Sequence, residues 1–227
     1  IALSYSLPHW PWLGRHIDRR LHAASAQVGF RFNSFIALAL ASKLMGPDGL
    51  LHIAVLIGVC VPLFNVGAVW PMARHANRGF ARELVRNPLI IATASGLVAN
   101  LLGLSIPGWL QPSVERVGQS SLALGLMAAG AGMHFGSLAK ARLLAMQVLG
   151  IKHLAMPLLA TLLAQAFGLD SAQSLALLMF SAVPTASSCY VLAARMGYDG
   201  GYVAGLVTLS TLLGLASISL ALGLLAP

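Results

Sequence analysis

The sequence predicts an all-α polytopic membrane protein, with seven membrane-spanning helices in this chain. Hydrophobic residues make up 58% of the 227 and charged residues only 9%, whereas soluble proteins are about 25% charged. The mean hydropathy is +0.82. So few charges cannot cover a water-exposed surface, which excludes a soluble monomer, and the same composition excludes disorder. Apolar runs of the ~20 residues that a helix needs to cross a bilayer recur along the chain, without the alternation of β-barrel strands.

The apolar runs are separated by short connections that contain polar, glycine and proline residues. Gly46-Pro47-Asp48-Gly49 and Ile106-Pro107-Gly108 are such connections, as is the arginine-rich stretch 74–86. We therefore expect seven spans, at residues 26–45, 50–71, 88–104, 120–138, 143–167, 172–194 and 202–225.

The start of the chain reads as the end of another apolar segment. Residues 1–7 are apolar, and Pro8-His9-Trp10-Pro11-Trp12 is typical of an interfacial turn with aromatic anchors. There is no initiator Met, and no basic region of a signal peptide precedes the apolar residues. We expect residues 1–25 to be the end of a missing upstream helix followed by a cytoplasmic loop, in a chain that is N-terminally truncated.

Basic residues are concentrated in the connections on one side of the predicted spans. They are Arg15, Arg19, Arg20 and Arg31 before or entering the first span, Arg74, Arg78, Arg82 and Arg86 after the second, and Lys140 and Arg142 after the fourth. Because lysine and arginine are enriched in cytoplasmic loops, this side is predicted to be cytoplasmic and the C-terminus to lie outside. The net charge of +8 is then mainly a topology signal, so no nucleic-acid partner is expected.

One short segment occurs twice with opposite predicted orientation. Lys43-Leu44-Met45-Gly46-Pro47-Asp48-Gly49 recurs as Ala194-Arg195-Met196-Gly197-Tyr198-Asp199-Gly200 at an offset of 151, and each copy joins two spans. Inverted repeats are typical of secondary transporters. The alternative is a turn that arose twice by chance, which the matching span boundaries and opposite polarity disfavour.

The predicted span 172–194 contains Pro184, followed by Thr185, Ser187 and Ser188. A proline in mid-helix removes a backbone hydrogen bond, and in a bilayer the freed carbonyl needs another partner. One interpretation is a broken helix that lines a polar cavity and offers N–H groups to an anion. The other is a simple proline kink whose hydroxyls bond their own backbone. The repeat favours the broken helix.

Lys152 is the sharpest single candidate for contact with a substrate. It lies inside the span 143–167, and a lysine at the centre of a membrane helix costs about 2.5–3.5 kcal/mol on insertion scales. No acidic residue occurs inside any predicted span to pair with it, which favours an anionic substrate as its partner. The alternative is a lysine whose stem lets the charge reach the cytoplasmic interface.

The other polar residues inside the spans are interpreted as structural. Asn65 and Asn100 suit hydrogen bonds between helices, and His52, His134 and His153 suit satisfied structural histidines, although a proton-coupling role for one of them stays open. No set of His, Cys and carboxylate residues has metal-ligand spacing. We expect neither a metal nor another cofactor.

Several short motifs follow one another in the order and spacing of a known family. They are Arg31-Phe32-Asn33-Ser34, Arg86-Asn87-Pro88-Leu89-Ile90, Ala129-Gly130-Ala131-Gly132-Met133, Lys152 with Pro157, and Ser181-Ala182-Val183-Pro184-Thr185. From about residue 27 to 225 the chain resembles the auxin efflux carrier family of membrane transporters, which includes proposed bacterial malate and malonate permeases.

The resemblance implies a fold similar to that of the bile-acid sodium symporters, with ten helices in two inverted five-helix halves. Their fourth and ninth helices are broken and cross at the substrate site. By this match, residues 26–72 are the last two helices of the first half, residues 73–87 a cytoplasmic basic loop, and residues 88–227 the complete second half.

The resemblance also implies the substrate-binding residues. They are Asn33 and Ser34 in the first crossing helix, Pro184, Thr185, Ser187 and Ser188 in the second, and Lys152. Family members often carry a proline shortly after the asparagine. Residues 34–40 contain none, so the first crossing helix is expected to be less sharply broken.

The function that these observations favour is secondary active transport of small organic anions, dicarboxylates or auxin-like weak acids, by alternating access in the bacterial inner membrane. The partners expected are the anion, the lipid bilayer, the proton as the candidate coupling ion and, left open, a second copy in a homodimer. The alternatives are a non-transporting partner or receptor-like protein and a non-functional truncated transporter. An intramembrane enzyme that uses Cys189 is disfavoured, because no catalytic motif such as G-x-S-x-G or H-E-x-x-H accompanies it.

Overall fold

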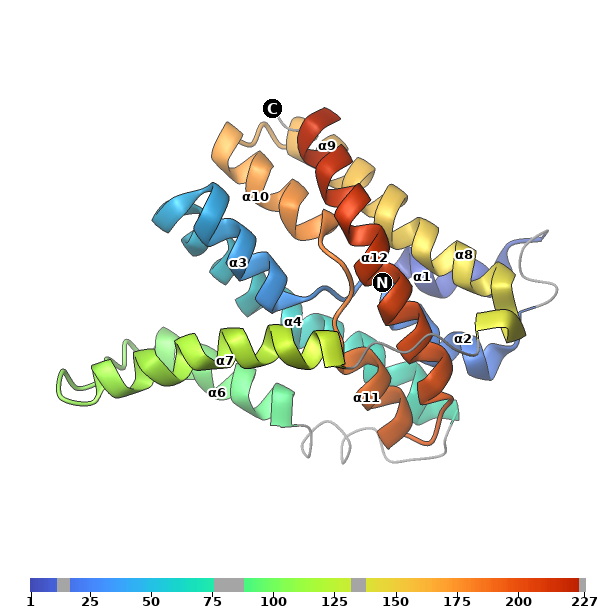
Figure 1. Cartoon of the computed structure of the whole chain (residues 1–227), viewed down its shortest axis with the longest axis horizontal. Helices are drawn as coiled ribbons and strands as arrows, with labels where there is room; N and C mark the ends of the chain where they lie inside the picture. Colours follow the sequence, from blue (N-terminus) through green and yellow to red (C-terminus); the bar gives the residue numbers. More distant parts are fainter. Residues whose placement is uncertain (12–16, 76–87, 132–137, 225–227) are drawn as a thin grey trace.

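The computed structural model describes residues 1–11, 17–75, 88–131 and 138–224, and within these ranges it is helical and contains no strand. Figure 1 shows the arrangement of the elements. In chain order they are α1 (Ala2–Ser6), η1 (Leu7–His9), α2 (Arg19–Ser25), η2 (Ala26–Gly29), α3 (Ser34–Leu44), α4 (Gly46–His75), α6 (Pro88–Leu101), α7 (Gln111–Ala131), η3 (Leu138–Ala141), α8 (Arg142–Gly150), η4 (Ile151–Ala155), α9 (Met156–Ala166), α10 (Ser171–Ala182), α11 (Ser188–Arg195) and α12 (Gly200–Leu224).

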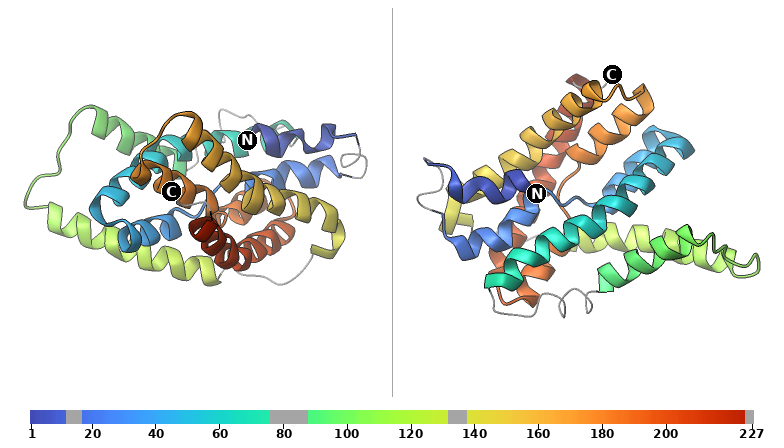
Figure 2. Two further views of the ribbon diagram at one scale, coloured as in Figure 1. Left: turned by 90° about the horizontal axis from the view of Figure 1, so that it is seen from above. Right: turned by 180° about the vertical axis from the view of Figure 1, so that it is seen from behind.

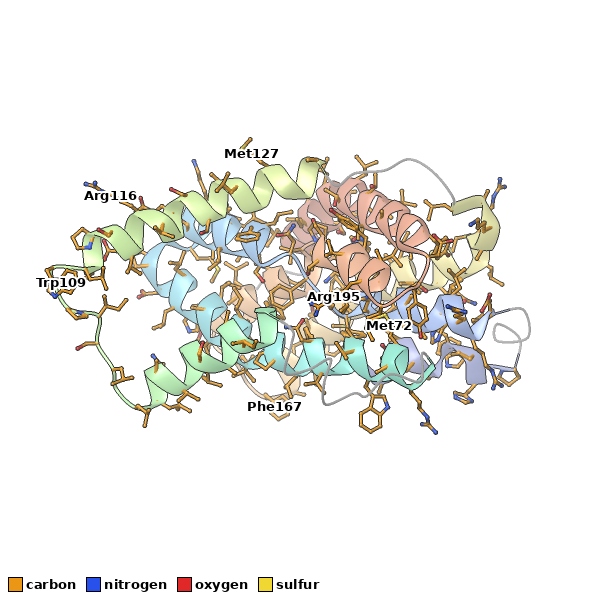
Figure 3. All side chains as sticks on the ribbon, turned by 90° about the horizontal axis from the view of Figure 1, so that it is seen from below. Met72, Trp109, Arg116, Met127, Phe167 and Arg195 are labelled. Atoms are coloured by element: carbon orange, nitrogen blue, oxygen red, sulfur yellow. The ribbon has the colours of Figure 1, made fainter. Side chains whose placement is uncertain are left out.

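The body of the molecule is a bundle in which α10 has a central position. It packs against α9, α12 and α4, while α3 lies on α4 and α11 on α12. The helices α6 and α7 contact α4 and α3 respectively, and together they extend away from the bundle (Figures 1 and 2). Trp109, in the link between them, is 81% exposed and lies at the far tip in Figure 3.

Three continuous helical segments in the described ranges are long and apolar enough to cross a membrane. They are Gly46–Arg74, Leu138–Ala166 and Gly200–Gly223, which overlap the predicted spans 50–71, 143–167 and 202–225. The predicted spans 88–104 and 120–138 correspond to α6 and α7, and the end of the second lies outside the described residues. So do His134 and most of the predicted basic loop 73–87. The predicted spans 26–45 and 172–194 are each interrupted.

The first interruption separates η2 from α3, at residues 30–33. The span 26–45 is therefore not one continuous helix, although no proline lies within it. The cause is Asn33, whose carboxamide oxygen accepts hydrogen bonds from the N–H groups of Phe35 and Ile36 at 3.1 and 3.2 Å. Asparagine is a preferred N-cap residue because it satisfies donors that the first turn leaves free. The cap starts a new helix at Ser34, and the chain before it is left unwound.

The second interruption separates α10 from α11, at residues 183–187. The helix α10 begins with a capping box of Asp170 and Gln173 and ends at Ala182, because Val183 takes an extended conformation (φ −62°, ψ 148°). A residue before proline is driven out of the α region by the ring that follows, and Pro184 is that ring. The break that the sequence interpretation favoured is present.

The rod formed by α8, η4 and α9 contains a wider turn in its middle. The N–H of Met156 bonds the carbonyl of Ile151, five residues earlier, which makes η4 a π-helical turn. Pro157 follows at the start of α9, and its missing N–H disturbs the regular ladder at this point. Single π turns inside helices occur frequently at functional sites, and here the consecutive residues Ile151, Lys152 and His153 are all buried.

Two apolar clusters lie on either side of the interruptions. One contains Phe30 together with residues from α2, α8, α11 and α12, and the other contains Phe32 with residues from α3, α4 and α10. Phe64 of α4 joins them, because its ring lies 5.6 Å from that of Phe30 and 6.0 Å from that of Phe32. The residue between the two phenylalanines, Arg31, is therefore held at the boundary of both clusters.

Candidate functional site

The two interruptions are in direct contact. The backbone N–H of Asn33 donates to the carbonyl of Pro184 at 2.8 Å, so the link between α2 and α3 meets the link between α10 and α11, as can be followed in Figure 1. A Cβ placed on Gly214 of α12 would lie 3.0 Å from the Pro184 ring. A larger residue at this position would push α12 and the second link apart by a few tenths of an ångström.

A hydrogen-bonded chain through His153 holds the end of α10 and the middle of the second link. The hydroxyl of Ser217 donates to the carbonyl of Ala182 at 3.3 Å, and Ser210 Oγ accepts the N–H of Thr185 at 3.0 Å. His153 lies between the two serines, with Nδ1 2.8 Å from Ser217 Oγ and Nε2 2.9 Å from Ser210 Oγ. One neutral tautomer satisfies every group: Nδ1–H donates to Ser217, and Ser210 donates to Nε2. The histidine is therefore bonded at both ring nitrogens.

Lys152 lies in the π turn and is only 1% exposed. Its Nζ donates to the carbonyl of Ser181 at 3.2 Å. The last carbonyls of a helix have no partner within it and form the negative end of its dipole, so the end of α10 is a favourable place for a cation. The lysine side chain does not reach the surface of the molecule. Within the described residues no carboxylate pairs with it.

Arg31 is a second buried cation. From the sequence it was grouped with the cytoplasmic charges before or entering the first span. It is 6% exposed, and its guanidinium donates to Gln27 Oε1 at 2.9 Å, to Asn65 Oδ1 at 3.0 Å and to Ser188 Oγ at 2.9 Å. It therefore joins α4 and α11 to the first link. One feature of the sequence could have indicated this burial: Arg31 lies between Phe30 and Phe32. If Arg31 lay at the membrane surface, these two large apolar side chains would lie there as well.

Of the two candidate residues of the first crossing, Asn33 makes its hydrogen bonds to backbone groups. Asn33 uses its carboxamide oxygen to cap α3 and its N–H to contact Pro184. Ser34 is the first residue of α3 and is half-buried.

The candidate residues of the second crossing lie on the second link and at the start of α11. Pro184 and Thr185 are buried, and Thr185 Oγ1 lies 3.5 Å from Cys189 Sγ. Ser188 Oγ accepts from Arg31. Ser187 Oγ is buried and has no hydrogen-bond partner. Lys152 reaches the same link through Ser181. The structure therefore gathers all seven candidates on or beside the contact between the two breaks.

Charged residues at one end of the bundle bring predicted loops together. Lys140 forms an ion pair with Asp199 at 3.0 Å, and Arg20 donates to the carbonyl of Gly197 at 3.2 Å. The backbone N–H of Tyr202 and the ammonium of Lys140 hold the pKa of Asp199 below its ordinary value. The loops around Arg20, Lys140 and Asp199, which the charge distribution assigns to one side, therefore lie at one end of the molecule. Most of the arginine-rich loop 73–87 lies outside the described residues.

A comparison of the sequence with known families assigns the chain to a class of protein. A family model described as "Membrane transport protein" matches residues 16–222 of the chain. The chain belongs to this auxin efflux carrier-like family of membrane transporters. The resemblance drawn from the motifs is thereby confirmed. No curated protein and no solved structure matches the chain. Membership in the auxin efflux carrier-like family makes the protein an integral membrane protein with a role in transport, and the family is one of transporters, not of enzymes.

Proposed function

We propose that the protein is a secondary active transporter that carries small organic anions, dicarboxylates or auxin-like weak acids, across the cytoplasmic membrane by alternating access. The observation that carries this proposal is the contact of two unwound links, in which Asn33 N–H meets the carbonyl of Pro184 at 2.8 Å. In secondary transporters, discontinuous helices that meet in this way present half-helix ends and free backbone groups to the substrate.

The charge inside the bundle supports an anion as the substrate. Lys152 is buried with only a neutral carbonyl as its recorded partner, and burial of an unpaired charge costs several kcal/mol. An anion bound near Asn33, Ser34, Lys152, Pro184, Thr185, Ser187 and Ser188 would supply the missing negative charge. Alternating access would then consist of one group of helices rocking against the other around this contact.

The topology that goes with this function is an inverted repeat. We propose that the interrupted segments and α6 and α7 also cross the membrane, which makes seven spans, and that residues 26–72 are the end of one repeat and residues 88–227 the whole of the other. Support comes from the Met-Gly-x-Asp-Gly match and from one interruption in each proposed half. The end that carries Arg20, Lys140 and Asp199 would be cytoplasmic in a bacterial inner membrane, and the C-terminus would lie outside.

Two further parts of the proposal concern coupling and assembly. A gradient would drive transport, with the proton as the candidate coupling ion, and the transporter would work without a nucleotide or another cofactor. A homodimer is the proposed assembly. Uptake that responds to an imposed pH gradient, and mass measurement of the purified protein in detergent, test these two statements separately.

Uptake of radiolabelled succinate and benzoate into vesicles that contain the purified protein tests the function. Lys152→Gln removes the buried charge and should lower uptake at least about tenfold, since a hydrogen bond to a charged group contributes about 1.5–3 kcal/mol. Lys43→Gln is the matched control, because Lys43 is exposed in the last turn of α3. Equal uptake by Lys152→Gln and the parent would remove Lys152 from the site, and no uptake of any carboxylate above that of empty vesicles would refute the transport proposal.

A further inference from the structure

Arg31 is a charged group without a charged partner. Its three recorded hydrogen bonds all go to neutral oxygens, those of Gln27, Asn65 and Ser188. An arginine keeps its charge at any physiological pH. A fixed positive charge is therefore buried at the contact between the two links.

The carboxylates in the described ranges are engaged or located elsewhere. Asp18 and Asp170 cap α2 and α10, Asp199 pairs with Lys140, Glu115 accepts from Gln111, and Asp48 lies in the first turn of α4. None of these carboxylates pairs with Arg31. Because removal of an ion from water without a counter-ion costs several kcal/mol, the arrangement is suited to receive a negative charge from outside the chain.

Two unused hydrogen-bond donors belong to Asn65, which bonds the guanidinium, and to Ser187, which precedes Ser188 in the chain. Asn65 bonds Arg31 through Oδ1, while its Nδ2 is buried and has no partner, and Asn65 as a whole is 1% exposed. Ser187 Oγ, one residue before the serine that Arg31 contacts, is also buried without a partner. Ser187 and Ser188 stand at the N-terminus of α11, the positive end of the helix dipole. The Arg31 guanidinium has five N–H donors, and its bonds to Gln27, Asn65 and Ser188 use three of them.

Gln27 fixes the guanidinium in this position. Its Oε1 accepts from Arg31, and its Nε2 donates to the carbonyls of Ala24 and Cys189 at 2.9 and 3.2 Å. All of its polar atoms are thereby used within the chain. Gln27 is therefore a positioning residue, and the free donors belong to Arg31, Asn65 and Ser187.

We propose that Arg31, Asn65 and Ser187 form a subsite that binds a carboxylate group of the transported anion, with the Arg31 guanidinium as its counter-charge. The inference rests on the proposed function and adds to it the group that would recognise the negative charge at the first link. A guanidinium N–H forms a charge-assisted hydrogen bond to a carboxylate oxygen, and the carboxamide and hydroxyl donors fill further acceptor positions of the two oxygens.

The first experiment measures KM and kcat for radiolabelled succinate and benzoate uptake by the reconstituted protein. Arg31→Gln should raise KM at least about tenfold, and Arg31→Lys should give a smaller rise, because an ammonium keeps the charge but lacks the fixed planar donors of the guanidinium. Arg116→Gln is the matched control, since Arg116 is exposed on α7 and points away from the bundle in Figure 3. Benzamide, the neutral counterpart of benzoate, should not compete. An unchanged KM in Arg31→Gln with a lowered kcat would overturn the inference and leave Arg31 as a structural tie between helices.

Two further variants test the subsite even where Arg31→Gln fails to fold. Asn65→Asp places a carboxylate beside the guanidinium at the same size, so it should raise the midpoint of thermal unfolding and raise KM at least about tenfold, because the internal anion occupies the site. Ser187→Ala removes a hydroxyl that makes no internal bond, so it should leave the midpoint unchanged and raise KM severalfold, whereas the control Ser219→Ala should leave KM unchanged. An Asn65→Asp protein with the KM of the parent would overturn the inference.

Thermal unfolding with and without succinate or benzoate separates this inference from the proposed function. A carboxylate-dependent rise of the midpoint that Arg31→Gln abolishes, in a protein that takes up neither anion, would support the subsite and refute transport. Uptake with a KM that does not depend on Arg31 would support transport and refute the subsite. The absence of both uptake and stabilisation would refute both.

Discussion

The hydrogen-bonded chain through His153 makes a quantitative prediction about the second link. In His153→Ala the hydroxyl of Ser210 loses the acceptor to which it donates, while its other bond, from Thr185 N–H, remains. A buried donor left without a partner costs about 1–3 kcal/mol, and the bond to Ser217 contributes about 0.5–1.5 kcal/mol more. We therefore expect His153→Ala to lower the free energy of unfolding by about 1.5–4.5 kcal/mol.

The assay is reversible denaturant unfolding of the purified protein in detergent, with linear extrapolation to zero denaturant. His9→Ala is the control, because His9 is exposed at the end of η1, and it should change the free energy by no more than about 0.5 kcal/mol. Ser217→Ala breaks the same chain, so the double variant with His153→Ala should cost less than the sum of the two single variants. A His153→Ala protein as stable as the His9→Ala control, or strictly additive losses, would refute the proposed chain of bonds.

Three further predictions concern the first break, the close approach of α12 and the charged end of the bundle. Asn33→Ala removes the N-cap of α3 and should lower unfolding free energy by about 1 kcal/mol, whereas Asn33→Asp keeps a capping oxygen and should lose less; equal losses would contradict the cap. Gly214→Val places carbon atoms against the Pro184 ring and should lower the midpoint of thermal unfolding more than Gly223→Val, where the space beside the Cβ is open. The pKa of Asp199 is lowered in the folded state, chiefly by the N–H of Tyr202. The ionised carboxylate therefore stabilises the fold at pH values above the unfolded-state pKa of about 3.9. This stabilisation is lost as the pH falls through the folded-state pKa. The midpoint of thermal unfolding should accordingly fall less steeply in Asp199→Asn than in the parent between about pH 6 and pH 3, and parallel curves would contradict this.

The segments whose conformation depends on nearby residues could be predicted closely. Composition and the lengths of the apolar runs predicted a helical membrane protein, and the order of short motifs predicted the family that the family model confirms. Pro184 predicted the end of α10, since the proline ring and its missing N–H act on the residues just before it. Asn33 was recognised as a candidate through the family motif, although its capping geometry was not foreseen.

The placement of charges could not be read from local patterns. Arg31 was counted among the cytoplasmic charges before or entering the first span, and only its contacts with Asn65 and Ser188 show that it lies inside the bundle. These residues are separated from it by 34 and 157 positions, so no local window contains the information. Lys152 was correctly located within a helix, but its contact with the Ser181 carbonyl depends on the π turn and on the end of a different helix.

The sequence by itself determined what kind of protein this is, because hydropathy, proline effects and family motifs act over a few neighbouring residues or over the chain as a whole. The tertiary structure alone decided which polar groups meet. Asn33 N–H bonds the Pro184 carbonyl, His153 joins Ser210 to Ser217, and Arg31 bonds Asn65 and Ser188. The physical reason is that a buried polar group must be satisfied by whatever helix packs against it, and packing partners are distant in sequence.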